Sequence, residues 1–297
     1  MIDEKNPSKF QIWILAARPK TLYAAVTPVI VGAAIAYSQK EFNFFTSVLA
    51  LICSLLIQIG ANFSNDLQDF LKGSDTDERV GPTRALSAGW ISRKQMEKAI
   101  FIVNLIAFLI GLYLTYVGGW IILFIGIFCI IAELAYTSGP YPLGYHGFGD
   151  LFTFICFGVA GTVGTFIVNS HFYSNIALIA SIPVGALITN ILVVNNYRDY
   201  EEDKKSGKNT LAVKLGKTFS RYEFIFLLII SYAIPIIMYF QYNFTLWILL
   251  PLISIPVAYR IISMLYKFEG KELNKVLAKT SQFAAIFGIL FSIGLII

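Results

Sequence analysis

Two short polar segments of the chain, each directly following a long apolar run, carry asparagine and aspartate at four-residue spacing. The residues concerned are Asn65, Asp66, Asp69, Asn195, Asp199 and Asp203. If each helix continues past its apolar run, residues four apart lie on one helix face. Carboxylates stacked on one face repel one another unless a cation lies between them. Such oxygen ligands favour Mg²⁺, which binds through one or two carboxylates together with the phosphates of a substrate.

Two such faces lying opposite one another would hold a diphosphate through bridging Mg²⁺ ions. We predict the four aspartates and Asn195 as metal ligands, with Asp69 and Asp199 as catalytic residues. The predicted substrate contacts are Asn65, Asn196, Lys72, Arg84, Arg198, Lys204 and Lys208. The five bases of this set would neutralise the remaining charge. The alternative, two solvated loops, suits Glu201 and Glu202 better than it suits aspartates at the ends of membrane helices, where ionisable groups are costly.

Membrane helices are the elements that must position these residues. Of the 297 residues, 57% are hydrophobic and 14% are charged, whereas a soluble globular domain carries about 25% charged residues. Because a bilayer crossing takes about 20 apolar residues, the apolar runs predict nine spans in a single all-α membrane domain covering 1–297. The predicted spans are 22–38, 46–65, 98–117, 119–137, 151–169, 174–195, 222–240, 246–265 and 280–297.

The basic residues predict the orientation of this polytopic helical bundle. If the N-terminus faces the cytoplasm, 22 of the 23 Lys and Arg residues lie on the cytoplasmic side, and Lys40 alone lies on the other. Cytoplasmic loops of membrane proteins carry an excess of Lys and Arg. We therefore predict a cytoplasmic N-terminus and a site that faces the cytoplasm. The net charge of +5 is then a topology signal, and nucleic-acid binding is not expected.

The two motifs, Asn65-Asp66-x-x-Asp69 and Asp199-x-x-x-Asp203, resemble the paired aspartate-rich motifs of the UbiA superfamily of intramembrane aromatic prenyltransferases. Three further stretches resemble one branch, the 1,4-dihydroxy-2-naphthoate polyprenyltransferases of menaquinone synthesis. These stretches are 17–21, 72–84 and 136–145. The likeness runs from about residue 14 to residue 215, and the last three predicted spans match in hydrophobicity only.

The resemblance implies nine helices around a lateral cavity, with Mg²⁺ and diphosphate at the cytoplasmic end and the prenyl chain among apolar helices. It implies a protein of the bacterial inner membrane that transfers a polyprenyl group from polyprenyl diphosphate to 1,4-dihydroxy-2-naphthoate. Loss of the carboxyl group would then give demethylmenaquinone. The sequence departs from the superfamily pattern at Gly73, where an acid is expected four residues after Asp69. Asp75 follows two residues later and joins the predicted metal ligands.

Ionising an allylic diphosphate creates an anion and an allylic cation. Aromatic faces can stabilise the cation, and of the 45 aromatic residues we predict Tyr136 as the catalytic one. The loop 138–149 contains no Lys, Arg, Asp or Glu; we expect it to enter the cavity as a lid against water, the alternative being an ordinary turn between helices. Arg18 would bind the carboxylate of the aromatic acid or anchor the first span. Glu133 would orient a base or a substrate hydroxyl, or lie at the water boundary.

Other classes of membrane protein fit the sequence less well. Kinked helices and intramembrane charges also suit a carrier of an anionic solute, but the acids gather at one membrane surface rather than at the midplane. A CDP-alcohol phosphotransferase needs glycine directly after the second aspartate of its motif, and Phe70 follows Asp69 here. Within the superfamily, 4-hydroxybenzoate, homogentisate, haem and chlorophyllide are the alternative acceptors.

Overall fold

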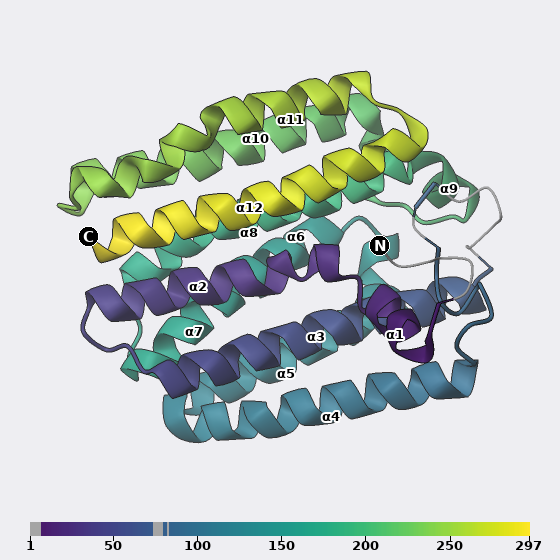
Figure 1. Cartoon of the computed structure of the whole chain (residues 1–297), viewed down its shortest axis with the longest axis horizontal. Helices are drawn as coiled ribbons and strands as arrows, with labels where there is room; N and C mark the ends of the chain where they lie inside the picture. The colour runs from purple at the N-terminus through teal and green to yellow at the C-terminus, as the bar shows by residue number, and fades with distance from the viewer. Residues whose placement is uncertain (1–6, 74–79, 82) are drawn as a thin grey trace.

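The computed structural model describes residues 7–73, 80–81 and 83–297. Helices form all the regular secondary structure of this described part, and most of them lie side by side along the long axis of the molecule (Figure 1). The long helices are α2 (Tyr23–Ser38), α3 (Phe44–Leu71), α4 (Arg93–Gly118), α5 (Trp120–Thr137), α8 (Asn175–Arg198), α10 (Leu211–Gln241) and α12 (Leu273–Ile296).

The remaining helices are short or joined to a neighbouring segment. A π-helical segment, Phe154–Ala160, joins α6 (Gly149–Thr153) to α7 (Gly161–Ser170). A 3₁₀ segment, Leu246–Ser254, leads into α11 (Ile255–Lys267). The short helices α1 (Lys9–Ala17) and α9 (Tyr200–Lys205) lie at one end of the bundle.

Eight helical segments of the described residues are long and apolar enough to cross a membrane, or nine if a bent pair counts as one span. This confirms the predicted membrane bundle of about nine helices. The bent pair is Lys9–Thr21 with Tyr23–Ser38, at 55°. Within the first member, α1 ends at Arg18, whose backbone is left-handed with φ of 51°. The 16 residues of α2 rise only about 24 Å, less than a hydrocarbon core of about 30 Å, so α2 is shorter than a full crossing.

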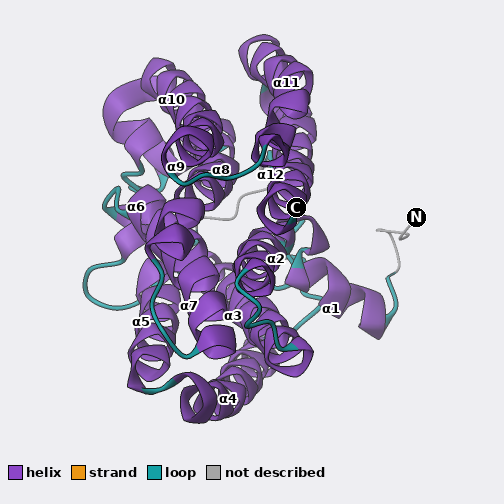
Figure 2. Ribbon diagram, turned by 90° about the vertical axis from the view of Figure 1, so that its left-hand side faces the viewer, coloured by secondary structure: helices purple, strands orange, loops and turns teal. Residues whose placement is uncertain are grey.

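The helices form a closed circuit in which the first long helix meets the last (Figure 2). Neighbours around the bundle follow chain order from α2 to α12, and α12 packs back against both α2 and α8. The approach of α12 to α2 is close: a Cβ added at Gly288 would lie 2.5 Å from a methyl carbon of Thr27. Because Gly288 has no side chain, α12 packs tightly against α2 at this point. The last long helix thus contacts the first one.

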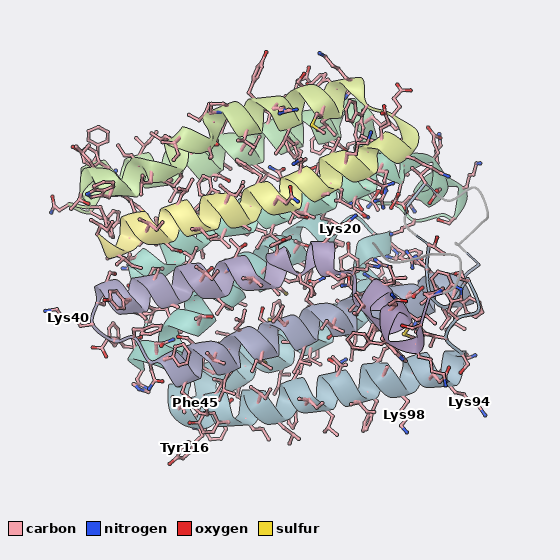
Figure 3. All side chains as sticks on the ribbon, in the orientation of Figure 1. Lys20, Lys40, Phe45, Lys94, Lys98 and Tyr116 are labelled. Atoms are coloured by element: carbon pink, nitrogen blue, oxygen red, sulfur yellow. The ribbon has the colours of Figure 1, made fainter. Side chains whose placement is uncertain are left out.

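Charged and aromatic residues mark the two ends of the bundle. Figure 3 shows Lys94 and Lys98 toward one end of the bundle and Lys40 at the other end, which also carries Phe45 and Tyr116. Tyr116 is 87% exposed, and aromatic side chains at such positions are typical of a membrane–water boundary. The end with α9 also holds the C-termini of α3, α5 and α8, and we call it the polar end.

Candidate active site

The first acidic segment belongs to the last turns of α3 at the polar end. The apolar run predicts a span that ends at residue 65, but the helix continues to Leu71. Asp66 and Asp69 are therefore on a helix, as predicted, and both are buried. Lys72 caps the helix through its backbone N–H, so the acids lie in the final two turns.

The second acidic segment differs from the predicted single helix. The helix α8 ends at Arg198, Asp199 has φ −88° and ψ 9°, and α9 begins at the next residue. Two backbone hydrogen bonds of helical spacing nevertheless cross this break: the N–H of Asp199 donates to Asn195 O at 3.0 Å, and the N–H of Asp203 donates to Asp199 O at 2.8 Å. Asp199 and Asp203 consequently both remain buried.

Each of three buried acids has a basic partner, and the pairs are Asp69–Arg84, Asp199–Arg198 and Asp203–Lys208. Arg198 donates from Nε to Asp199 Oδ1 at 2.6 Å and from Nη2 to Asp199 Oδ2 at 2.7 Å. Arg84 also donates from Nη1 to the carbonyl of Asn65 at 2.7 Å. Buried charges persist only when paired and hydrogen-bonded, so these bases balance the acids of both segments.

Asn274, on α12, is a contact of this cluster that sequence reasoning missed. Arg198 Nη1 donates to Asn274 Oδ1 at 2.9 Å, and Asn274 Nδ2 donates to the carbonyl of Val80 at 2.9 Å. The backbone N–H of Val80 in turn donates to Glu202 Oε1 at 2.6 Å. This chain of hydrogen bonds links three segments that are distant in sequence. No local pattern around Asn274 indicates this role.

The pKa of Asp203 is raised because its carboxyl group is buried near other acids. Burial raises the pKa of Asp203 to about 6, and the carboxylates of Asp199 and Asp69 act in the same direction, against the positive charge of Lys208. Its Oδ2 accepts no hydrogen bond from any described residue. A carboxylate of this kind is stabilised by an added cation.

The loop 138–149 lies against the acidic cluster through Tyr145, which sequence reasoning did not single out. The Tyr145 hydroxyl donates to Asp69 Oδ1 at 3.0 Å. Lys72 Nζ lies 3.6 Å from the centroid of the Tyr145 ring and donates to Thr137 O at 2.9 Å. Burial lowers the pKa of Lys72, whereas the charge of Asp69 opposes this change. The uncharged composition of the loop was the one available signal.

Tyr136 lies where the acidic cluster meets the interior of the bundle. A Cβ added at Gly144 would lie 2.8 Å from a Tyr136 ring carbon, and one at Gly149 would lie 2.9 Å from the Tyr136 hydroxyl. Two glycines of the loop therefore make room for this ring. The hydroxyl is within electrostatic range of three carboxylates, those of Asp69, Asp150 and Asp203.

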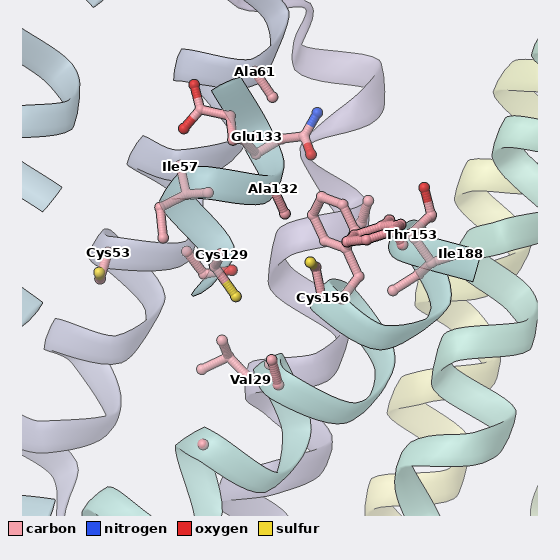
Figure 4. A pocket seen from close by; sticks show the side chains of 18 of the residues that line it. Val29, Cys53, Ile57, Ala61, Cys129, Ala132, Glu133, Thr153, Cys156 and Ile188 are labelled. Atoms are coloured by element: carbon pink, nitrogen blue, oxygen red, sulfur yellow. The ribbon is translucent and has the colours of Figure 1, made fainter. Parts of the chain in front are cut away.

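A cavity of ≈290 Å³ extends from the acidic cluster between α2, α3, α5, α6–α7 and α8. Its lining along α3 runs from Ala50 to Asn65, which corresponds to about 22 Å at 1.5 Å per residue. Asn65 and Asn195 line its polar end. Arg18, Glu133 and several amide and hydroxyl side chains also line the cavity, but most of the remaining lining is apolar or thiol, including Ile188 and Cys156 (Figure 4). The cavity thus joins a charged end to an apolar interior.

The other residues predicted to bind metal or substrate are not all part of the acidic cluster. Arg18 lines the cavity. Asn196 is buried but is not among the described lining residues. Lys204 is exposed on α9. Asp75 lies outside the described residues.

The donor set at the polar end suits a hard cation that brings ligands of its own. Within the described ranges, no group of three or more Asp, Glu, His or Cys side chains is placed to hold a metal ion. Asn65 Oδ1 and Asp203 Oδ2 are buried oxygens that accept no hydrogen bond from described residues. Since Mg²⁺ typically takes one or two carboxylates plus substrate phosphates, these oxygens fit an ion that arrives with a diphosphate.

Comparisons with known proteins agree on one family. The model of the UbiA prenyltransferase family matches residues 25–287. A protein of Haemophilus influenzae named 1,4-dihydroxy-2-naphthoate octaprenyltransferase is 34% identical, over 100% of this chain and 98% of its own length. The protein of the same name from Escherichia coli is 33% identical, over 98% of this chain and 97% of its own length.

Solved structures share the fold. A UbiA homolog from Aeropyrum pernix has a TM-score of 0.70 at 14% identity, covering 93% of this chain and 96% of its own. A UbiA homolog from Archaeoglobus fulgidus bound to GPP and Mg²⁺ has a TM-score of 0.63 at 14% identity, covering 96% of this chain and 99% of its own. At 14% identity, the TM-scores of 0.70 and 0.63 establish a common helical fold alone.

Proposed function

Since the chain belongs to the UbiA prenyltransferase family, we propose that it transfers a polyprenyl group from an allylic diphosphate to 1,4-dihydroxy-2-naphthoate. Loss of the carboxyl group would then give demethylmenaquinol, the reduced (hydroquinone) form of demethylmenaquinone. The observation that carries the proposal is the junction at Tyr136, where a cluster of buried acids and bases meets an apolar cavity. The names of the full-length bacterial relatives favour the naphthoate acceptor.

The acids and bases of the polar end would bind the diphosphate. Asp66, Asp69, Asp199, Asp203 and the asparagines would hold Mg²⁺, with Asp75 as a further proposed ligand. When bound, Mg²⁺ would neutralise the charge that develops on the leaving diphosphate. Arg84, Arg198 and Lys208 could each exchange a carboxylate partner for a phosphate oxygen. Lys72, beside the Tyr145 ring, would add a further positive charge. Guanidinium groups bind carboxylates and phosphates with the same planar geometry.

Tyr136 would face the allylic carbon once the C–O bond breaks. The Tyr136 residue lines the cavity and interacts electrostatically with nearby carboxylates. A desolvated cation–π contact between its ring and the allylic cation would contribute about 2 kcal/mol. The loop that carries Tyr145 would keep water away from the cation, because its backbone is fixed to the segment after α9. The Asn209 N–H donates to Tyr145 O at 3.0 Å, and Lys214 Nζ donates to His146 O at 2.7 Å.

Arg18 would bind the carboxylate of the acceptor. It lines the same cavity as Tyr136, and the turn that contains it is attached to α3. Asn62 Nδ2 donates to Ala17 O at 2.9 Å and to Thr21 Oγ1 at 3.1 Å. This attachment places a guanidinium at the cavity wall and reduces the entropy lost when it binds a planar carboxylate.

The orientation of the protein is part of the proposal. The excess of Lys and Arg at the polar end supports a cytoplasmic N-terminus, with the polar end toward the cytoplasm. The bacterial relatives support a place in the inner membrane. A substrate diphosphate would then enter from the cytoplasmic side while its chain stays in the bilayer.

The experiment that tests the function supplies purified protein in lipid nanodiscs with Mg²⁺ and a polyprenyl diphosphate. A panel of acceptors is assayed in parallel: 1,4-dihydroxy-2-naphthoate, 4-hydroxybenzoate and homogentisate. We expect pyrophosphate release and a prenylated, decarboxylated product with the naphthoate alone. Transfer to a different acceptor would reassign the substrate, and solute flux into liposomes without prenyl transfer would replace the proposal with a carrier.

A further inference from the structure

Glu133 is a buried carboxylate that the function described so far does not use. It lies on α5 and is 7% exposed, and of the described residues that line the cavity it is the one acid. Figure 4 shows Glu133 near Ile57 and Ala61, in the wall where α3 and α5 meet. A carboxylate without a basic partner in an apolar wall is costly, so its presence calls for a physical explanation.

Three helices combine to hold one oxygen of this carboxylate, and the other oxygen is buried without a hydrogen-bond partner among the described residues. Ser64 Oγ on α3 and Asn104 Nδ2 on α4 each donate to Glu133 Oε1 at 3.4 Å. Oε2 accepts no hydrogen bond from the described part of the chain. A Cβ added at Gly60 would lie 2.8 Å from Oε1, so the absence of a side chain at Gly60 provides the space for the carboxylate.

Arg18 and Glu133 reach the cavity at the same level of α3. Asn62 holds the turn that contains Arg18, while Gly60 and Ser64, two residues to either side of it, contact Glu133. At 100° per residue, Asn62 points to the side of α3 opposite Gly60 and Ser64, and Arg18 and Glu133 both line the cavity. Glu133 is also three residues before Tyr136 on α5, about 4.5 Å along the axis. An acceptor ring bound in the cavity between Arg18 and Glu133 would therefore lie beside the proposed site of the allylic cation.

We propose that Glu133 is the catalytic base for the acceptor, binding a ring hydroxyl through Oε2 and taking its proton as the ring attacks the allylic carbon. The inference rests on the proposed function. Together, a guanidinium for the carboxylate and a carboxylate for the hydroxyl select a hydroxylated aromatic acid over a neutral phenol.

The electrons and the proton balance in this step. The allylic C–O bond breaks, and its electron pair leaves with the diphosphate. A π pair of the ring forms the new C–C bond, the hydroxyl O–H bond breaks, and its pair becomes the π bond of a ring carbonyl. The proton moves to Glu133 Oε2. It returns to the ring oxygen when the carboxyl group leaves as carbon dioxide and the ring becomes aromatic again.

The test combines Glu133→Gln with acceptors in which one hydroxyl at a time is methylated. Glu133→Gln keeps the size of the side chain and removes the basic oxygen. We expect kcat with the natural acceptor to fall by roughly 10²–10³-fold, within the range for a general base, with unchanged binding of a non-ionising thiolodiphosphate analogue. With one of the two methyl ethers as acceptor, the kcat of the wild type should fall to that of Glu133→Gln. The kcat of the variant should be the same with this ether as with the natural acceptor.

Two controls separate this role from a structural one. Gly60→Ala displaces the carboxylate without removing it, so it should also lower kcat while leaving analogue binding unchanged. Glu97→Gln changes an exposed acid of α4 that pairs with Arg93 and should keep the wild-type rate. Unfolding temperature in nanodiscs shows whether each variant is folded.

Two results would overturn the inference: a wild-type kcat in Glu133→Gln, or equal fold-losses from methylation in wild type and variant. Either result with an active wild type leaves the proposed function standing. If wild type itself transfers no prenyl group to the naphthoate, the proposed function fails instead. The comparison of wild type and Glu133→Gln, with and without a methylated hydroxyl, can then be repeated with the acceptor that the protein does prenylate.

Discussion

The hydroxyl of Tyr145 donates a 3.0 Å hydrogen bond to Oδ1 of Asp69, 76 residues earlier in the chain. This contact connects the loop between α5 and α6 to the acidic end of α3. The other oxygen of Asp69 pairs with Arg84. The loop therefore helps to set the position of a proposed metal ligand.

Tyr145→Phe should lower kcat/KM for the diphosphate substrate, because it removes the hydroxyl that contacts Asp69 while keeping the aromatic ring beside Lys72. A hydrogen bond to a charged group contributes about 1.5–3 kcal/mol, so kcat/KM for the polyprenyl diphosphate should fall by roughly 10–100-fold. Steady-state kinetics at saturating acceptor measures this. Tyr141→Phe, in an exposed residue of the same loop, is the matched control, and equal losses in both variants would contradict the role of Tyr145.

Asp69→Asn and Asp199→Asn should each lower kcat by at least roughly 10²-fold, as removal of one electrostatic contact at a reacting centre does. Both substitutions keep side-chain size but remove a charge that balances Arg84 or Arg198. Glu201→Gln, in an acid whose side chain is 69% exposed, should leave the rate unchanged. Wild-type rates in both aspartate variants would show that the metal site lies elsewhere.

Mg²⁺ and pyrophosphate should stabilise the protein together more than either does alone. The described residues hold no group of three acidic or other metal-binding side chains, so the ion needs phosphate ligands to complete its coordination. A ligand at 100 times its Kd stabilises a protein by about 2.7 kcal/mol. Thermal unfolding with Mg²⁺, with pyrophosphate, with both, and with both plus EDTA measures the effect. An equally large shift with Mg²⁺ alone would indicate a preformed site.

Gly149→Ala should lower both stability and activity, because the added Cβ would lie 2.9 Å from the Tyr136 hydroxyl. Overpacking of this kind costs about 1–3 kcal/mol. Gly126→Ala, on α5, is the control for stability, since a Cβ there would meet no described atom within 4 Å. If the two variants unfold at the same temperature, the loop does not confine the Tyr136 ring.

Arg18→Lys should raise KM for the aromatic acid by about tenfold or more, because an ammonium group cannot form the planar bidentate pair with a carboxylate. The KM for the diphosphate should stay unchanged. Kinetics with each substrate varied in turn separates the two constants. A rise confined to the diphosphate KM would move Arg18 from the acceptor to the other substrate.

Local sequence patterns determined which segments are helices and where the acids stand on them. Long apolar runs need about 20 residues to cross a bilayer, so the number of spans follows from composition and run length. The four-residue spacing from Asn65 to Asp69 is also a local signal, and α3 carries both residues as expected. The break at Asp199 was missed, because no glycine or proline interrupts the residues around it.

Only the tertiary structure decided which residues meet. The pairs Tyr145–Asp69, Arg198–Asn274 and Asn104–Glu133 join residues 76, 76 and 29 positions apart. Such contacts depend on which helices are neighbours and on how each helix is rotated about its axis. The sequence does not determine this rotation, because a membrane helix that is apolar on every face could turn any of its faces toward lipid. The sequence by itself thus determined membrane helices with acids at one end. The packing of α12 against α2 and α8, and of the loop against α3, decided where those acids lie relative to Tyr136 and Glu133.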